Sequence, residues 1–405
     1  MIGLKQYIDI FEGGLGGHMA HPFDYTDFTA NDLIDLVQSL FGGKIENLKE
    51  KLDGMNLNAT MNNNGEVRFI RNDGDLNSPN GGMSIEDMLE KWAGKEHQKN
   101  VFVPSGKLIE KVFKRVDVRY FNPDATHRKV INCECIIAGN TNIIPYATDR
   151  VAFHGYKMYE LTNGKYKLVE DVEGNVDELY DAAKDIDEAK PRPNLVIRSV
   201  EDGLKFAEKF SNEITNLWRE DGLSNDATIE EWKHVRFKKF APEWMRDDDD
   251  LYDRICNNDK SINLTQLKKR YPEHVDELSR IDKDIKKEVL ANIMDPIDNL
   301  FLSIGNELID MLDGFINSGS KDELIKSLKN DLESTVEQVE SSDSEEVKEK
   351  LNKSLKRLQA LGNKFNVAEG IVVMYKGRRL KLTGSFAPLN QALGTRFDLE
   401  KINKN

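Results

Sequence analysis

The segment Glu50-Lys51-Leu52-Asp53-Gly54-Met55-Asn56 places a lysine between two carboxylates and close to a glycine. The apolar residues Ile45 and Leu48 precede it, and apolar and polar residues alternate after it, so we expect Lys51 where a helical segment gives way to a strand. A glycine lets a ligand approach the backbone, and a lysine held there suits nucleophilic attack on a phosphate. The alternative is an ordinary turn, because Lys-x-Asp-Gly occurs in many proteins.

The whole chain has 405 residues, which is long enough for two or three domains with a sizeable core. It has no apolar run of about 18 residues and no charged-then-apolar leader, which predicts a soluble, cytoplasmic protein without a membrane partner. Its three cysteines are Cys133, Cys135 and Cys256. Their odd number suits a reducing compartment, and their spacing does not match a structural zinc site.

The formal net charge is −14, which by itself argues against a nucleic-acid partner because phosphate binding depends on clustered lysine and arginine. The distribution of charge changes this argument. Residues 171–366 contain 45 acidic and 30 basic residues, so the acidic excess belongs to the middle of the chain. The two flanking segments are close to neutral and can still present a basic groove.

The first 170 residues are predicted to form an α+β module with antiparallel strands. Thr29 begins a predicted amphipathic helix that ends at Gly42, and a second helix is expected from Ser84 to Trp92. The pair Asn163-Gly164 is typical of a hairpin turn. Alternating apolar and polar residues predict strands at 67–70, 116–120, 130–137 and 151–154.

Near the start of the chain, glycines surround His18, and His21 follows shortly after. This stretch lacks the third glycine of a dinucleotide-binding fingerprint, so a flexible loop is expected. The two histidines are either ligands of a metal or phosphate or ordinary surface residues.

Helical periodicity dominates residues 171–365, and a strand pattern returns at 370–375 and 378–382 around a predicted Lys376-Gly377 turn. A tail of about 40 residues is too small to fold alone. We therefore predict one antiparallel domain, formed by residues 1–170 and 366–405, that is split by an all-helical insertion of residues 171–365. Three consecutive domains are the alternative.

The two parts of this split domain contain groups of matched chemistry. Their candidate roles are nucleophile for Lys51, phosphate or ribose contact for Arg71, sugar-hydroxyl acceptor for Glu134, base-stacking ring for Phe153, metal ligand for Glu369 and phosphate clamp for Lys381. Each has a simpler alternative. Arg71 could be a surface turn residue, Phe153 a core residue, and Arg379 with Lys381 a solvated strand face.

The order of these residues resembles the covalent nucleotidyltransferase superfamily, which comprises ATP-dependent DNA ligases, RNA ligases and messenger-RNA capping enzymes. Glu50–Asn56 resembles its nucleotide-attachment motif, and the position of Asn56 is similar to that in phage-type RNA ligases. The remaining matches are Arg71 in an Arg-x-x-Gly turn, Glu134 as the third-motif glutamate, Phe153 as the purine-stacking aromatic, Glu369-Gly370-Ile371-Val372 as the fourth motif, and Arg379-Leu380-Lys381 as the final Lys-x-Lys pair.

The chain also departs from the family pattern. Met374 occupies the place of the usual fourth-motif lysine, which makes Lys376 the substitute candidate. The spacing from Glu369 to Lys381 is short for the family. Only 24 residues follow Lys381, so no C-terminal oligonucleotide-binding barrel is expected, and the helical insertion is expected to clamp the substrate instead. On this view, a chain without residues 175–362 should keep measurable adenylylation but seal strands less well.

The resemblance implies an ATP-dependent ligase that joins 3′-hydroxyl and 5′-phosphate ends of RNA or DNA through a covalent lysyl-AMP. It also implies a monomer that uses Mg²⁺, or Mn²⁺ in its place, and a phage-encoded protein acting in a bacterial host is a further expectation. The implied catalytic residues are Lys51, Lys381 and Arg379; the nucleotide-binding residues are Glu50, Asp53, Gly54, Asn56, Arg71, Glu134, Phe153 and Lys376; the metal ligand is Glu369.

Two alternatives from other classes remain open. One is a capping-type guanylyltransferase, which GTP labelling would reveal. The other is a non-enzymatic helical interaction protein with a degenerate nucleotidyltransferase module, for which the acidic middle of the chain is the best support.

Overall fold

The computed structural model describes residues 19–139, 144, 146–173, 175–257, 264–280, 286–316, 321–366 and 368–403. The glycine-rich stretch and His18 lie outside these residues. The described chain combines helices with antiparallel sheets, as the α+β prediction requires.

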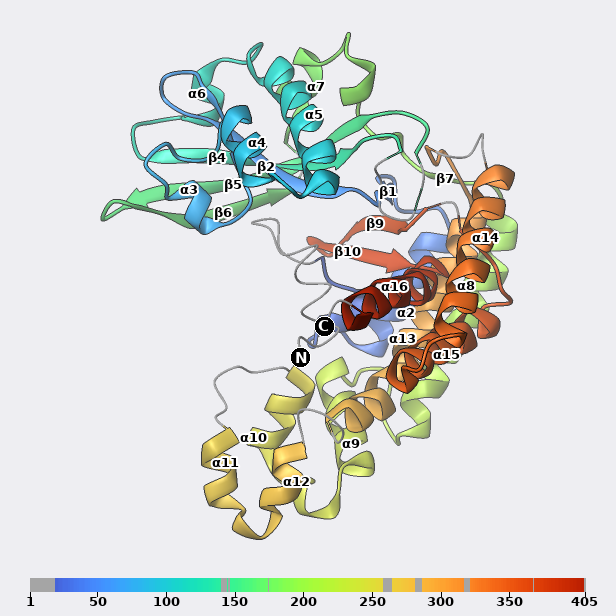
Figure 1. Ribbon diagram of the computed structural model, residues 1–405. Coiled ribbons are helices and arrows are strands. Elements are labelled where there is room, and N and C mark those ends of the chain that lie inside the picture. The colour runs from blue at the N-terminus through green and yellow to red at the C-terminus, as the bar shows by residue number, and fades with distance from the viewer. Residues whose placement is uncertain are drawn as a thin grey trace.

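A five-stranded antiparallel sheet forms one end of the molecule (Figure 1). Its strands run in the order β3 (Val67–Ile70), β2 (Met55–Met61), β4 (His127–Ile136), β5 (Arg150–Thr162) and β6 (Lys165–Glu173). The long helix α5 (Glu96–Phe113) covers one face of this sheet, and a core of apolar side chains from both fills the space between them. Three short helices contribute to this core: α4 (Ile85–Lys91), α6 (Val118–Phe121) and α7 (Asp177–Ala182). Helix α3 (Asp73–Leu76) packs through Leu76 in a separate cluster with Ile70, Val130 and Tyr159.

A three-stranded antiparallel sheet lies beside the first sheet (Figure 1). Its strands run in the order β1 (Lys49–Lys51), β9 (Gly370–Tyr375) and β10 (Arg378–Thr383). One face of this sheet is apolar, and it packs against α2 (Ala30–Phe41) and α13 (Lys286–Met311) in the largest core of the molecule. Side chains of α8 (Val200–Glu220) belong to the same core.

The remaining helices extend from this core (Figure 1). They are α9 (Ile229–Phe240), α14 (Lys321–Glu340), α15 (Glu345–Ala360) and the final α16 (Phe386–Asn403), together with α10 (Asp249–Tyr252), α11 (Leu264–Arg270) and α12 (Val275–Arg280) at the far end from the sheets. A two-stranded ribbon pairs β7 (Val196–Ile197) with β8 (Leu312–Asp313). In the part of the chain that the structure describes, short turns of 3₁₀ or π-helix occupy Pro22–Asp24, Asp187–Ala189, Glu243–Met245, Asp253–Asn257 and Pro272–His274.

Several local predictions are confirmed. Thr29 caps α2 by accepting a hydrogen bond from the Asp32 amide, and Ser84 caps α4 in the same way through Asp87. The Asn163-Gly164 turn joins β5 to β6 with both residues at positive φ. Among the described residues, no helix is long and apolar enough to cross a bilayer.

Two local predictions are wrong, and one helix was missed. Residues 116–120 do not form a strand: the Asp117 side chain caps the Arg119 amide and starts α6. The long helix α5 was not anticipated. No helix precedes Lys51, which instead ends the short strand β1. This segment is extended because it pairs with β9 on one side and with the segment around Leu195 on the other.

Candidate active site

Strand pairing brings Lys51 and Glu369 together, although they are 318 residues apart in the sequence. β1 is antiparallel to β9, with Lys51 opposite Gly370, so the residue before Gly370 lies beside the lysine. The Lys51 ammonium group and the Glu369 carboxylate form an ion pair in which both side chains are largely buried. The predicted meeting of these two distant motifs is therefore present in the structure.

Four basic residues lie on one face of the three-stranded sheet. Opposed residues in antiparallel strands point to the same side, and successive residues alternate. The register places Lys49 and Lys381 opposite Val372, Arg379 opposite Met374, and Lys51 two residues from Lys49, so these four basic residues share a face. The other face contains the apolar residues that enter the core. The expectation that Arg379 and Lys381 accompany Lys51 on one surface is consistent with this register.

The five-stranded sheet contributes a histidine to the same region. His154 is buried, and its pKa is held well below the ordinary value, first by burial and then by the positive charges of Arg192, Arg379 and Lys51. Arg192 connects this histidine to the three-stranded sheet, because its guanidinium contacts Nδ1 of His154 and the main-chain oxygen of Glu50 in β1. The candidate site is thus bounded by both sheets.

The turn after Lys51 is held by main-chain contacts. The Asp53 carboxylate accepts a hydrogen bond from the Ile144 amide at 2.7 Å, and the Asp53 amide donates to the Tyr146 hydroxyl at 3.1 Å. A Cβ atom on Gly54 would lie 2.9 Å from both the Cys135 carbonyl oxygen and the Glu134 Cγ. Only glycine allows this close approach, so Gly54 holds the turn against β4.

Glu134 belongs to a chain of polar contacts that reaches a third segment. Its carboxylate lies 3.4 Å from Nε2 of His154, and Nδ1 of His154 lies 3.0 Å from the Arg192 guanidinium. Arg192 also donates a hydrogen bond of 2.6 Å to the main-chain oxygen of Glu50. Glu134 also lies against Gly54 in the turn after Lys51, and a contact from Glu134 to a nucleotide sugar stays a prediction.

Asn56 and Arg71 are engaged with one another. The Arg71 guanidinium donates to the main-chain oxygen of Asn56 and lies over the Phe102 ring, 4.9 Å from its centroid. The Asn56 side chain donates to that of Asn132 on β4. In this arrangement Arg71 supports the start of β2, and a phosphate or ribose contact from Arg71 stays a prediction.

Glu50 is a correction to the predicted nucleotide-binding set. It precedes Lys51 on β1 and therefore points to the opposite face of the sheet, where its side chain is buried. Its carboxylate accepts a hydrogen bond of 2.8 Å from the Ile316 amide, in the segment after α13. Burial raises the pKa of Glu50 to about 7. The side chain of Glu50 is therefore part of the buried interior beneath the site and does not face the basic residues.

Phe153 is a second correction. It lies opposite Cys133 on the face of the five-stranded sheet that α5 covers, whereas Glu134 lies on the other face. Its ring packs against Phe113 and Tyr180 with centroid separations of 6.1 and 5.5 Å. The simpler interpretation as a core aromatic is correct, because the residues next to it on β5 take the site-facing positions.

Lys376 is a third correction. It lies in the β9–β10 turn at a positive φ and pairs with Asp32 of α2. Six residues separate it from Gly370 along an extended strand, a distance of about 20 Å. Lys376 is therefore at the end of the hairpin away from Lys51 and does not replace the fourth-motif lysine.

His21 is next to Ala20, whose main chain contacts the three-stranded sheet. Its ring stacks on Phe23 with centroids 5.0 Å apart, and its amide donates to Asp24. The adjacent Ala20 accepts a hydrogen bond from the Lys381 amide. This stacking favours the interpretation of His21 as an ordinary structural residue.

The sequence interpretation missed Lys49, His154 and Arg192. Lys49 is two residues from Lys51, and strand alternation could have placed both on one face. His154 interrupts an apolar run on β5, and a buried ionisable residue of that kind is a signal in itself. Arg192 stands between two prolines in an apparent linker, and nothing local indicates that it returns to β1.

The carboxylates present fit a magnesium ion only in combination with a substrate. Among the described residues, no group of three or more His, Cys, Asp or Glu side chains could hold a metal ion. Mg²⁺ commonly takes one or two carboxylates together with substrate phosphates, and Glu369 beside Lys51 meets that requirement.

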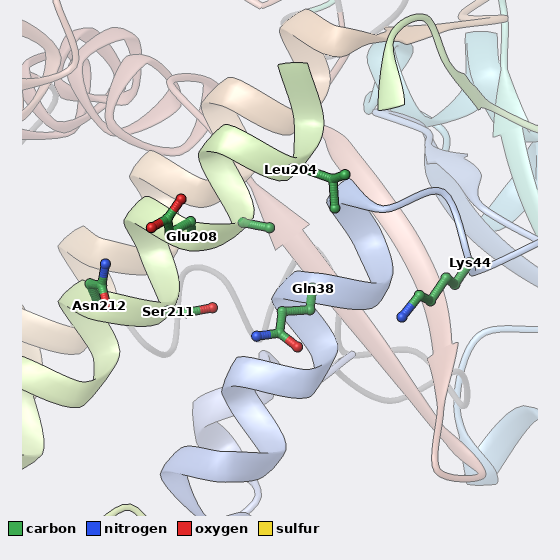
Figure 2. Close-up of a pocket in the computed structure, with 7 residues that line it drawn as sticks. Gln38, Lys44, Leu204, Glu208, Ser211 and Asn212 are labelled. Atoms are coloured by element: carbon green, nitrogen blue, oxygen red, sulfur yellow. The ribbon is translucent and has the colours of Figure 1, made fainter. Parts of the chain in front are cut away.

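A surface groove of about 340 Å³ lies elsewhere, between α2 and α8. Figure 2 shows Gln38 on one of these helices and Glu208, Ser211 and Asn212 on the other. None of the predicted site residues lines this groove, and it is not part of the candidate active site.

Comparisons of the chain with protein-family models, curated proteins and solved structures found no match.

Proposed function

We propose that the protein is an ATP-dependent polynucleotide ligase that forms a covalent lysyl-AMP at Lys51. The observation that carries this proposal is the position of the Lys51 amine: it is largely buried, contacts Glu369, and shares its sheet face with three other basic residues. A nucleophilic lysine surrounded by phosphate-binding charges is what nucleotidyl transfer requires.

In the first step, Lys51 leaves its ion pair with Glu369 by releasing a proton to solvent, and the neutral amine attacks the α-phosphorus of ATP. A nitrogen–phosphorus bond forms, the bond to the bridging oxygen breaks, pyrophosphate leaves, and the nitrogen releases its second proton to solvent. Lys49, Arg379 and Lys381 neutralise phosphate charge from the same face of the sheet, and this neutralisation is the main contribution of a protein to phosphoryl transfer. Glu369 would hold Mg²⁺, which supplies further charge neutralisation when bound.

In the later steps, AMP moves from Lys51 to a polynucleotide 5′-phosphate, breaking the nitrogen–phosphorus bond and forming a pyrophosphate linkage. A 3′-hydroxyl then attacks the 5′-phosphorus, and AMP leaves as the strand is sealed. Glu134 accepts hydrogen bonds from sugar hydroxyls of the nucleotide, and its position beside Gly54 supports this role.

The direct test is to incubate the protein with α-labelled ATP and Mg²⁺ and to look for label that survives denaturation. We expect labelling of the wild-type protein and none of Lys51→Ala, because the amine is the attacking group. Lys376→Ala is the matched control: it removes a lysine of the same sheet at the far end of the hairpin, and it should label normally.

Failure of the wild-type protein to become labelled by ATP or GTP at any pH would overturn the proposal. Labelling by GTP alone would identify a capping-type guanylyltransferase. Assays on nicked RNA, nicked DNA and hybrid duplexes then determine which polynucleotide is sealed.

A further inference from the structure

His154 is held between a donor and an acceptor. Its Nδ1 lies 3.0 Å from Nη2 of Arg192, and its Nε2 lies 3.4 Å from Oε2 of Glu134. A guanidinium can only donate hydrogen bonds, so Nδ1 of His154 must accept. A neutral ring then carries its hydrogen on Nε2 and donates it to the carboxylate of Glu134. The contacts thus define one tautomer.

The neutral state of this ring follows from its surroundings. His154 is buried, and Arg192, Arg379 and Lys51 place positive charge around it, so its pKa lies well below the ordinary value. At neutral pH the ring therefore accepts a hydrogen bond from Arg192 and donates one to Glu134. We call this chain of hydrogen bonds the Arg192–His154–Glu134 link.

Arg192 is itself fixed to the strand of the candidate nucleophile. Its Nη1 donates to the Glu50 oxygen at 2.6 Å, and its own main-chain oxygen accepts from Lys49 Nζ at 2.8 Å. Two residues later the chain pairs with the outer edge of β1, where the Leu195 amide donates to the Leu48 oxygen at 2.8 Å. The link therefore begins at β1 and ends at Glu134.

At its far end, the link reaches the turn that follows Lys51. The Oε1 atom of Glu134 would lie 3.0 Å from a Cβ atom on Gly54, so the carboxylate is directed at that turn. One carboxylate oxygen contacts His154 while the other faces the turn. In the proposed function, this carboxylate accepts hydrogen bonds from the sugar hydroxyls of the nucleotide.

We propose that Arg192 and His154 are positioning residues that orient Glu134 toward the ribose hydroxyls of the nucleoside triphosphate, so that the site prefers ribonucleotides to deoxyribonucleotides. This inference rests on the proposed function. It adds two residues, one of them from the region that precedes α8, to the recognition of the nucleotide sugar.

Two substitutions of His154 separate its two contacts. His154→Gln places an amide donor near the Nε2 position and keeps the hydrogen bond to Glu134. His154→Asn places its amide near the Nδ1 position, where it can serve Arg192 but cannot reach Glu134. Both variants replace the ring with an amide, and thermal unfolding of each checks that both are folded.

The readout is the KM and kcat of lysyl-AMP formation with ATP, 2′-deoxyATP and 3′-deoxyATP. We expect His154→Asn to raise the KM for ATP by about 10-fold or more and to remove most of the preference over the deoxynucleotides, because a hydrogen bond to a charged group is lost. His154→Gln should keep the preference within about threefold, and kcat should change little in either. Equal preferences in the two variants would overturn the inference.

The tautomer of His154 can also be measured directly by NMR, whether or not the protein forms an adduct. Nitrogen chemical shifts of the His154 side chain distinguish protonated from unprotonated ring nitrogens. We expect a hydrogen on Nε2 only, from about pH 6 to about pH 8. A hydrogen on Nδ1 would overturn the link even if Lys51 becomes adenylylated. Absence of adenylylation with the expected tautomer would instead overturn the proposed function.

Discussion

Glu50 and Lys51 are neighbours in β1 but serve opposite faces of one sheet. Lys51 faces the basic surface, whereas Glu50 enters the core and receives the Ile316 amide. Burial raises the pKa of Glu50 from its ordinary 4.5 to about 7. A carboxyl group in this state keeps its proton in the folded protein at pH values where the unfolded chain releases it.

This difference predicts a pH-dependent stability. Between about pH 4.5 and about pH 7 the folded state binds the Glu50 proton more tightly than the unfolded state, so Glu50 lowers the free energy of unfolding as pH rises. Glu50→Gln lacks this contribution. We expect the variant to gain stability relative to wild type across that window, by up to about 3 kcal/mol.

Urea unfolding at several pH values measures this difference. The buried His154 is present in both proteins and contributes stability in the opposite sense as pH rises, so only the difference between the two proteins isolates Glu50. Glu349→Gln, at an exposed position of α15, is the control and should show no such trend. A difference between wild type and Glu50→Gln that is constant with pH would contradict the prediction.

At the scale of elements, α13 and β10 approach unusually closely. A Cβ atom on Gly305 of α13 would lie 2.1 Å from the Thr383 carbonyl oxygen, an impossible contact. The Asn306 side chain next to it accepts a hydrogen bond of 3.3 Å from the Ser385 amide. The helix therefore determines the position of β10, the strand that carries Arg379 and Lys381.

We expect Gly305→Ala to lower the free energy of unfolding by about 1–3 kcal/mol, because the helix must move away from the strand. Gly394→Ala in α16 is the matched control, since a Cβ atom there has no neighbour within 4 Å. Alanine should raise helix stability at that position by up to about 1 kcal/mol. Chemical unfolding of both variants measures these changes, and equal effects would contradict the close packing of α13 on β10.

At the scale of the whole molecule, the helical segment and the three-stranded sheet share one core. Ile297, Phe301 and Leu308 of α13 belong to the same apolar cluster as Ile371 and Leu382 of the sheet. Residues of the segment also support β1 directly, through Arg192 and Leu195. The cores of the molecule do not follow the predicted domain boundaries at 171 and 365.

This shared core reverses the expectation that a chain without residues 175–362 keeps adenylylation. We now expect that chain to lose both cooperative unfolding and adduct formation, because β9 and β10 would expose an apolar face. Circular dichroism on heating and ATP labelling test this. Inserting a short Gly-Ser linker between Ser342 and Asp343, in the turn between α14 and α15, is the control and should preserve both. A folded, labelled deletion protein would restore the original expectation.

The sequence predicted much of the local structure around the site. The strands at 67–70, 130–136 and 370–375, the Asn163-Gly164 hairpin and the caps at Thr29 and Ser84 all follow from alternation and turn chemistry. The association of Lys51 with Glu369 was expected from motif order alone, and pairing of β1 with β9 provides it. Most of these features depend on short stretches of sequence, and the association of Lys51 with Glu369 depends on the order of two motifs.

The errors have several causes. The face on which Phe153 lies depends on a β-bulge, which shifts the register of β4 and β5 between Asn132 and Cys133. No local sequence pattern predicts this bulge. Glu50 was grouped with Lys51 because they are adjacent in the motif, although adjacent strand residues face opposite sides. Arg192 reaches the site only because its segment pairs with β1, a contact across 142 residues of sequence.

The position of β1 has a consequence for the synthesis of the protein. On the ribosome, Lys51 emerges early, but the strand that pairs with it and the Glu369 carboxylate emerge 318 residues later. A nascent chain that has been translated only through α15 has neither. Its β1 has no β9 to pair with, and its largest core is incomplete. Contacts this distant form slowly, so any chemistry that Lys51 performs belongs to the finished chain and not to a partly translated one.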